Sequence, residues 1–465
     1  MDGIAYRHDR NLSSYRRKVR SGHLIARQYL LRKQTERKKL CIIYLIRSLV
    51  LLFFGIMLVP RASAEPLIFL STQLSPIHET NKMRQVILKG FPGEVDFKPC
   101  NKEVFNQLVI GSVSDIERPY LIGGLHGDFV ALYRKGVLNT VDDIWSRLEG
   151  REFVESFIQL GVLDGEHHYF IPWMQATYIM AANRRALKHL PKGADLDRLS
   201  YDQLKKWALK MHKAAGESKL GFPVGTKGLM HRFLQGYLYP SYTGSTVSKF
   251  RSPEAETMWK SFRELWKHVS PRSLSYNSMG KPLLTGEVWV AWDHTARLLE
   301  AFQEQPDEFV AFPAPAGPKG RGFMVVLAGL GLPKDSYSSE AADLIEYLTR
   351  SEVQIVTLES VGFFPVVQTG EIGKLPPGLA KIKDGVSKQA VSRDAVPSLL
   401  PVGLGERAKD FNMAYLGAFS KIVLRGGDIR PVLESQAERL RQIISEVQAR
   451  SWPPDKPSPG PCPVE

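Results

Sequence analysis

Short apolar runs alternate with amphipathic stretches from Glu65 to about Ala449. This alternation is typical of βα units, in which helices cover the buried strands of a largely parallel sheet. The runs that predict buried strands are 67–70, 177–182, 287–292, 309–312 and 323–328. The pattern therefore predicts an α/β fold.

The stretches between these runs carry signals for the start of a helix. Ser200 is followed three residues later by Gln203, which is the spacing of a capping box. Ser252 precedes Pro253, a pairing typical of an N-cap and a first helical position. A third helix is predicted over 339–348. The apolar stripes of these helices are interpreted as core packing, so they indicate fold rather than a ligand.

The length of the chain indicates more than one domain. The chain has 465 residues, and 401 of them follow residue 64. Single hydrophobic cores seldom extend beyond about 250 to 300 residues, so two domains are expected in this part. The last fifteen residues, from Ser451, contain six prolines, which predicts a flexible tail.

The net charge of +14 invites a nucleic-acid interpretation, but the charge is unevenly placed. Residues 1–64 contain 14 Lys and Arg against three Asp and Glu, which leaves the rest of the chain at about +3. Binding to many phosphates requires Lys and Arg clustered on the folded domain. A nucleic-acid partner is therefore not expected.

The basic leader has the order of a secretory signal peptide. Basic residues precede the apolar run 48–59, and Pro60 and the small residues 62–64 follow it. Twelve apolar residues fall short of the roughly 20 needed to span a bilayer. We expect cleavage after Ala64 and a periplasmic protein; a persistent anchor or a start codon further in remain alternatives.

Motifs for cofactors and catalysis are missing from the sequence. It has no phosphate-binding loop and no nucleophile elbow, and Gly329 and Gly331 lack the third glycine of a dinucleotide fingerprint. His167 and His168 are adjacent, which does not suit a shared zinc ion. No cofactor, metal or enzymatic activity is predicted, although a carboxylate pair from separate loops stays open.

Two cysteines, Cys100 and Cys462, follow the leader. Neither belongs to a C-x-x-C motif, so redox and zinc roles are not indicated. A disulfide between them and two free thiols are equally compatible with an oxidising compartment.

Several segments occur in the order and spacing of a known family. The sequence reads Leu-Asp-Gly at 163–165, Tyr-Phe-Ile-Pro-Trp at 169–173 and Tyr-Ile-Met-Ala-Ala-Asn at 178–183. Further pieces lie at 114–116, 135–138, 284–292, 341–348 and 362–365. Together they resemble the extracellular solute-binding proteins of bacterial ABC importers, specifically the carbohydrate-type family that includes maltodextrin-binding receptors. Ser114 departs from the usual proline, and no lipid-anchor cysteine follows the leader.

The resemblance implies a two-lobed periplasmic binding protein fold of the class II type, with the ligand cleft between the lobes. The lobes would comprise 65–173 with about 329–365, and 176–326 with about 368–449, before a tail at 450–465. Crossings between them would lie near 172–177, 326–329 and 364–367.

The implied function is capture of a sugar or sugar derivative, by a monomer, for an inner-membrane ABC permease. Alternatives are another solute, such as a polyol phosphate, a polyamine or ferric ion, an exported enzyme acting on a glycan, or a sensory partner of a membrane receptor.

A sugar site needs flat aromatic rings together with planar polar groups. Trp292 and Asp293 are the leading candidates, because a stacking ring and a hydroxyl acceptor would lie side by side at a strand end. Trp173 could equally pack the hinge, and His126 could be an ordinary loop histidine. The full set of candidate ligand residues, placed at predicted strand ends and crossings, is Gln73, Ser75, His126, Trp173, Gln175, Trp292, Asp293 and Phe364.

Overall fold

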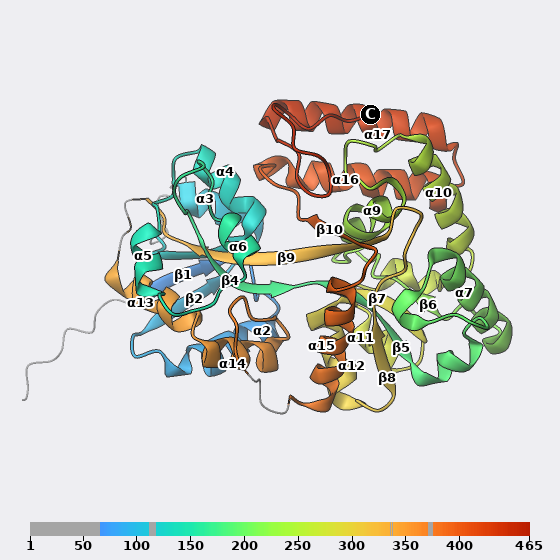
Figure 1. The fold of residues 1–465 in the computed structure, drawn as a ribbon, viewed down its shortest axis with the longest axis horizontal. Helices are drawn as coiled ribbons and strands as arrows, with labels where there is room; N and C mark the ends of the chain where they lie inside the picture. The colour runs from blue at the N-terminus through green and yellow to red at the C-terminus, as the bar shows by residue number, and fades with distance from the viewer. Residues whose placement is uncertain (1–65, 111–117, 335, 337, 371–374) are drawn as a thin grey trace, which may run out of the picture. The chain divides into compact units, whose positions relative to one another are not determined.

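The computed structural model describes residues 66–465, apart from 111–117, 335, 337 and 371–374 (Figure 1). The leader, its expected cleavage after Ala64 and the motif at Ser114 lie outside the described residues. Within the described part, no helix combines the length and the apolar character needed to cross a bilayer.

The first lobe contains most of a six-stranded sheet with the order β10-β9-β3-β1-β2, to which β4 is added by pairing with β9; β10 and the first half of β9 extend this sheet into the second lobe (Figure 1). The strands are β1 (Leu67–Ser71), β2 (Val95–Pro99), β3 (Leu121–Leu125), β4 (Ile171–Ala176), β9 (Arg321–Gly331) and β10 (Ala395–Leu399). The predicted first strand is confirmed, and all five residues of β1 are buried. Strand β1 runs parallel to both β2 and β3, whereas β9 is antiparallel to β3.

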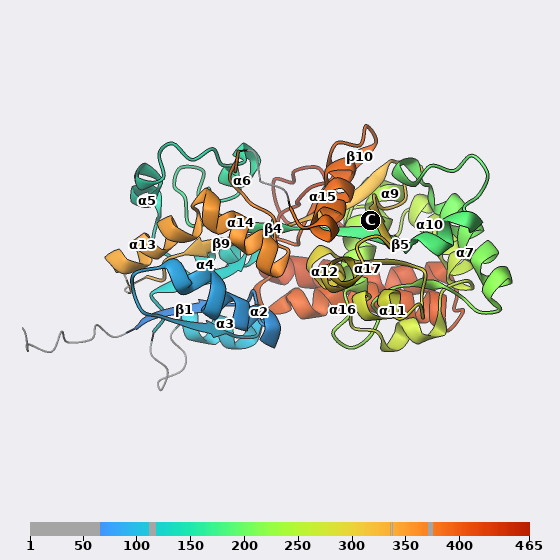
Figure 2. The same cartoon turned by 90° about the horizontal axis from the view of Figure 1, so that it is seen from below.

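Helices pack around this sheet (Figure 2). They are α2 (Ile77–Lys82), α3 (Lys102–Ile110), α4 (His126–Arg134), α5 (Asp142–Arg147), α6 (Glu155–Gln159), α13 (Ser339–Leu348) and α14 (Ser351–Val361). The predicted helix at 339–348 is confirmed as α13.

The second lobe contains a four-stranded sheet with the order β6-β7-β5-β8. Its strands are β5 (Tyr178–Asn183), β6 (Leu220–Gly221), β7 (Val290–His294) and β8 (Phe309–Phe312). The central strand β5 is antiparallel to both of its neighbours. The expectation of largely parallel sheets is therefore wrong for this lobe, and the strand expected at 287–292 begins only at Val290.

Long helices complete the second lobe. They include α7 (Tyr201–Ala215), α10 (Pro253–Trp266), α12 (Thr295–Glu304), α15 (Pro377–Ala390), α16 (Ala408–Phe419) and α17 (Ile429–Val447). The predicted capping box is present, because Ser200 Oγ accepts from the Gln203 backbone N–H while the Gln203 side chain accepts from Ser200 N. Ser252 likewise caps α10. Local polar chemistry thus sets where both helices begin.

The two lobes share their backbone hydrogen bonding at one place. Strand β4 pairs with β9, with Gln175 opposite Leu327, and Gln175 also exchanges backbone hydrogen bonds of 3.0 and 2.7 Å with Phe364. Only Thr177 separates β4 from β5 of the second sheet. The three predicted crossings therefore lie side by side, and Figure 1 shows β4 and β9 extending from one lobe to the other.

The glycines near the end of β9 allow close packing. A Cβ atom on Gly329 would lie 2.4 Å from the Phe170 ring, and one on Gly331 would lie 2.5 Å from the Phe129 ring. These positions therefore serve the contact between a strand and two aromatic rings, as expected for glycine inside a strand.

The segment from Ser451 to Glu465 packs against the second lobe, so the expectation of a flexible tail is wrong. Trp452, Cys462 and Val464 are buried. The buried Asp455 carboxylate accepts hydrogen bonds from the backbone N–H groups of residues 246–248 and from Ser245 Oγ. One carboxylate satisfies four donors of the loop before α10, which offsets the entropy of ordering a proline-rich segment.

Both described cysteines, Cys100 and Cys462, are free thiols. Burial raises the pKa of Cys100 to about 12 and that of Cys462 to about 11. Neither thiol is therefore activated as a nucleophile, because the reactive form is the thiolate.

Replacing Asp455 tests the docking of the C-terminal segment. Asp455→Ala leaves three backbone N–H groups without an acceptor, so we expect the free energy of unfolding to fall by about 3 kcal/mol. Urea unfolding followed by circular dichroism measures this change. The neighbouring exposed Lys456 provides the control, since Lys456→Ala removes no hydrogen bond. Equal stability of the two variants would contradict the structural role of Asp455.

Candidate ligand-binding site

A cavity of about 300 Å³ has walls from both lobes. The turn after β1 and helix α2 contribute one wall, and helices α8 (Met230–Phe233) and α12 contribute the other. Its lining residues are Thr72, Gln73, Leu74, Ser75, Pro76, Glu79, Leu125, Tyr178, Leu229, His231, Arg232, His294, Arg297, Val326, Phe363 and Leu400. This position suits a ligand that contacts two bodies at once.

A larger groove of about 840 Å³ lies within the second lobe, beside β8 and α15. Its lysines already have acidic partners: Lys381 pairs with Asp307, and Lys388 pairs with Asp197 and Asp384. The groove involves one lobe only, and its charges are balanced. The cavity between the lobes is therefore the better candidate for a solute site.

The first-lobe wall is a turn with a strained backbone. Leu74 has a φ of 55°, in the left-handed region, although its side chain is buried and carries a Cβ. Its carbonyl accepts a 2.8 Å hydrogen bond from Thr80 Oγ1. Such a conformation costs about 1 to 2 kcal/mol and persists where the surroundings enforce it. Here it anchors Leu74 in the core, while Gln73 and Ser75 on either side line the cavity.

Gln73 is held by its neighbours. Its backbone N–H donates to Ser71 Oγ, and its side-chain amide N–H donates to Thr72 Oγ1, both at 3.0 Å. Among the described residues, no donor reaches its amide oxygen. Gln73 can therefore accept a hydrogen bond from a ligand hydroxyl.

The second-lobe wall is cationic. Arg297 donates from Nη1 to the carbonyl oxygens of Asn277, at 2.6 Å, and Lys227, at 3.3 Å. The Arg232 side chain has no hydrogen-bond or ion-pair partner in the described part of the chain. His294 caps α12, its Nδ1 accepting from the Ala296 backbone N–H at 3.3 Å.

Both histidines of this wall are neutral near pH 7. Burial and the nearby Arg297 lower the pKa of His294 to about 3. Burial, with Arg232 and Arg297 adding to it, holds the pKa of His231 well below its usual range. The positive charge of the wall therefore resides on the two arginines.

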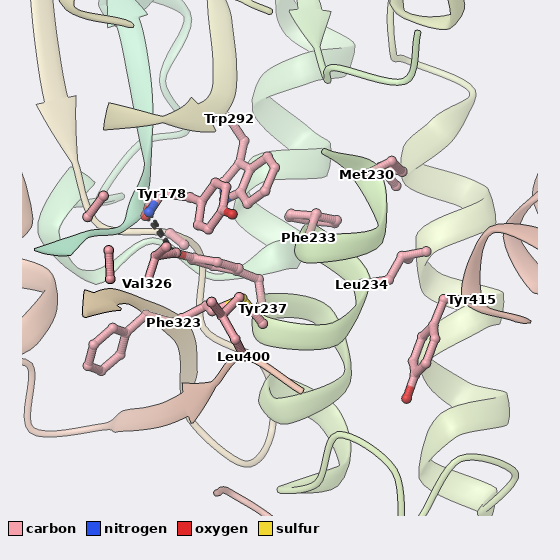
Figure 3. Packing of buried hydrophobic residues seen from close by; sticks show 14 of the residues in the cluster. Tyr178, Met230, Phe233, Leu234, Tyr237, Trp292, Phe323, Val326, Leu400 and Tyr415 are labelled. Atoms are coloured by element: carbon pink, nitrogen blue, oxygen red, sulfur yellow. Dashed lines mark hydrogen bonds between the residues drawn. The ribbon is translucent and has the colours of Figure 1, made fainter. Parts of the chain in front are cut away.

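Tyr178 and Phe363 are aromatic residues that line the cavity, and Trp292 stacks on the Tyr178 ring from behind (Figure 3). The two ring centroids are 4.8 Å apart with an interplanar angle of 8°. Tyr237 fixes the backbone of Tyr178, because its hydroxyl accepts from Tyr178 N and donates to Tyr178 O. Trp292 therefore supports the residue that faces the cavity.

The structure moves the leading candidates away from the cavity wall. Trp292 and Asp293 are both fully buried. Asp293 accepts from the backbone N–H groups of Met279, at 2.6 Å, and His294, at 2.7 Å, and so fixes the chain before α11 (Gly280–Leu284). The prediction placed them at a strand end correctly, but these side chains are directed into the core of the second lobe.

Three further candidates lie at the crossings. The β4 register shifts between Pro172 and Met174, and the Trp173 side chain packs in the first-lobe core, 5.4 Å from the Phe69 ring. The Gln175 amide donates to Pro365 O, and Phe364 belongs to the second-lobe core. None of the three lines the cavity. Of the eight predicted residues, Gln73 and Ser75 do.

His126 begins α4 and its side chain is buried. Burial lowers its pKa to about 4, while the Leu327 backbone and Asp128 act in the opposite direction and Arg232 adds to the lowering. It lies beside Leu125, a cavity residue, but does not line the cavity itself.

Sequence reasoning missed Tyr178, His231, Arg232, His294 and Arg297. Tyr178 stands in a quoted motif and His294 follows a predicted strand end, so both had a usable signal. Arg232 and Arg297 lie in helices without a distinguishing motif. Only the three-dimensional structure brings them to one wall.

The buried His126 makes stability dependent on pH. Its folded pKa of about 4 lies below the usual 6.5, so the unfolded chain binds more protons between these values. The free energy of unfolding that depends on neutral His126 is fully present above about pH 6.5 and is lost as the pH falls toward 4. The loss between pH 6.5 and 5 is about 1.5 kcal/mol. His126→Gln should flatten the stability curve by this amount in urea titrations at several pH values. The exposed His78 is the control, and a curve unchanged by His126→Gln would refute the assignment.

Comparisons with known proteins agree with this geometry. Residues 121–355 match the family model described as bacterial extracellular solute-binding protein. No curated protein sequence matches significantly.

Solved structures with the same fold include UgpB from Mycobacterium tuberculosis in complex with glycerophosphocholine, at 18% identity and a TM-score of 0.66, covering 82% of this chain and 99% of that one. The GacH receptor of Streptomyces glaucescens is 15% identical with a TM-score of 0.65, and the match covers 82% of this chain and 99% of that one. Maltose-bound MalE3 of T. maritima is 16% identical with a TM-score of 0.64, and the match covers 81% of this chain and 99% of that one. The two-lobed fold expected from the motifs is thereby confirmed, and this chain belongs to the family of bacterial extracellular solute-binding proteins.

Proposed function

We propose that the chain is the periplasmic substrate-binding component of an ABC importer. It captures a sugar or a sugar derivative in the cavity between its lobes and delivers it, as a monomer, to the inner-membrane permease. The observation that carries this proposal is the cavity itself, because its walls come from both lobes. Solved structures of the same fold hold maltose or glycerophosphocholine, which supports a polyhydroxylated ligand.

The proposal includes the leader and the division of the chain. Residues 1–64 direct export and are cleaved after Ala64. The first lobe comprises 65–173 with about 329–365, and the second comprises 176–326 with about 368–449. The C-terminal segment packs against the second lobe.

Capture follows from the placement of the walls. Gln73 and Ser75 come from the first lobe, whereas Arg232 and Arg297 come from the second. A ligand that contacts both walls stabilises the arrangement in which they are close. The permease would then distinguish the loaded receptor by the relative position of its lobes.

A glycan-acting enzyme is less well supported. Glycoside hydrolysis ordinarily requires two carboxyl groups on either side of the scissile bond. Among the described residues that line the cavity, Glu79 is the only carboxylic acid. Turnover of a glycoside by the purified protein would favour the enzyme instead.

A thermal-stability screen against neutral sugars, polyols and their phosphorylated or acidic derivatives tests the proposal. A ligand bound only by the folded state raises the unfolding midpoint, and the rise grows with the logarithm of the ligand concentration once this exceeds Kd. We expect such a rise with one solute class, and about fivefold weaker binding in Gln73→Ala because one hydrogen bond is lost.

The matched control is Gln442→Ala, which removes a glutamine on α17 that bonds only to Glu446. Its affinity should equal that of the unchanged protein. Failure of every solute to shift the midpoint would contradict the proposed function.

A further inference from the structure

The charges of the cavity between the lobes are not balanced by the protein. Arg232 and Arg297 face a lining that contains one carboxylic acid, Glu79. Glu79 is buried, and this burial raises its pKa to about 7 although Arg297 acts in the opposite direction. Near neutral pH, Glu79 is therefore only partly ionised.

The acidic groups behind the wall make no direct contact with the two guanidinium groups in the described part of the chain. Arg297 acts on the buried Asp293 through space, opposing the rise of the Asp293 pKa that burial causes, but the Asp293 oxygens accept from two backbone N–H groups and form no ion pair with Arg297. Asp128, on α4 near His126, pairs with Lys102 at 2.5 Å. Two guanidinium groups are thus left with less than one full counter-charge on the cavity surface.

The two arginines also have unused donors. Arg297 is fixed through Nη1 by two carbonyl oxygens, so its guanidinium is held in place while Nη2 and Nε have no acceptor in the described part of the chain. Arg232 has no acceptor for any of its side-chain N–H groups there. A guanidinium keeps its charge in proteins, and it pairs with oxyanions through two parallel hydrogen bonds.

The histidines beside the arginines are neutral, so the second-lobe wall offers N–H donors and the positive charge of two guanidinium groups. No described residue of this wall is a carboxylic acid. A neutral sugar would satisfy hydrogen bonds but would add no negative charge to offset the two guanidinium groups after water is displaced. An oxyanion satisfies both requirements at once.

From this wall we infer that the ligand carries an oxyanion, a phosphate or a carboxylate, which binds at Arg232 and Arg297 while its hydroxyl groups face Gln73 and Ser75. The inference rests on the proposed function and narrows it from sugars in general to acidic derivatives of a polyhydroxylated solute. Arg297 is the preoriented partner, and Arg232 is the partner that gains its hydrogen bonds when the ligand binds.

Paired ligands that differ only in charge test the inference. Calorimetric titration of the purified protein compares glucose with glucose 6-phosphate and glucuronate, and glycerol with glycerol 3-phosphate. We expect the charged member of at least one pair to bind at least about tenfold more tightly, because a close charge pair is retained or lost between the two. The phosphate and carboxylate arms identify which oxyanion is preferred. Raising the ionic strength should weaken binding of the charged member more than that of the neutral member.

Arg232→Gln should remove the preference for the charged member. This substitution breaks no intramolecular hydrogen bond, so the variant should fold, and its unfolding midpoint without ligand checks this. Arg232→Lys keeps the positive charge but loses the two parallel hydrogen bonds of the guanidinium, so it should retain part of the preference. Arg425→Gln is the matched control, since Arg425 is an exposed arginine of the second lobe outside the cavity.

Two results overturn the inference, and they are distinguishable. Equal or tighter binding of the neutral member, unchanged by Arg232→Gln, would reject the oxyanion but leave a sugar receptor. Absence of binding by both members of every pair would reject the proposed function and the inference together.

Discussion

The architecture depends on the hydrogen-bonded contact of three chain segments at Gln175, Leu327 and Phe364. Strand β9 pairs with β10 through its first half and with β4 and β3 through its second half, so one continuous strand extends through the region where the lobes meet. Because the β4 crossing pairs with both of the other crossings, its backbone groups are satisfied there. A change in lobe position must therefore be absorbed by the few residues next to this ladder, such as Thr177 between β4 and β5.

The cavity lies close to this contact and takes its form from it. Tyr178 is the first residue of β5, and Val326 lies on β9 one position from the ladder residue Leu327. The packing of Trp292 and Tyr237 around Tyr178 makes this part of the cavity rigid. Opposite it, the strained turn at Leu74 positions polar side chains on the first lobe. The rigid Tyr178 ring and the polar side chains of the turn therefore fix the orientation of a small ligand in the cavity.

A feature could be predicted from the sequence when the residues that produce it lie close together along the chain. The start of α7 was predictable because its capping box involves residues three positions apart. Strand β8 was predictable because its apolar run is bounded by Glu308 and Pro313. Trp292 was placed on the right strand but given the wrong role, since a period of two residues separates the faces of a strand without stating which one meets helices and which one meets a ligand. The tail was misjudged because proline content is local, whereas the hydrogen bonds of Asp455 join it to residues more than 200 positions away. Arg232 and Arg297 could not be found for the same reason: their common wall exists only after α8 and α12 have packed.

Burial acts differently on each kind of basic group in this wall, and that difference determines its charge. An imidazole can lose its proton, and His231 and His294 do so because burial disfavours their charged form, with Arg297 adding to this effect at both and Arg232 at His231. A guanidinium does not lose its proton under these conditions, so the protein must supply an acceptor or leave the charge available to a ligand. Arg297 receives two carbonyl oxygens for one nitrogen, and Arg232 receives none. The side of the cavity that faces Gln73 and Ser75 is therefore positively charged through residues whose charge does not vary with pH in the neutral range, and Glu79 is the group of the lining whose ionisation changes there.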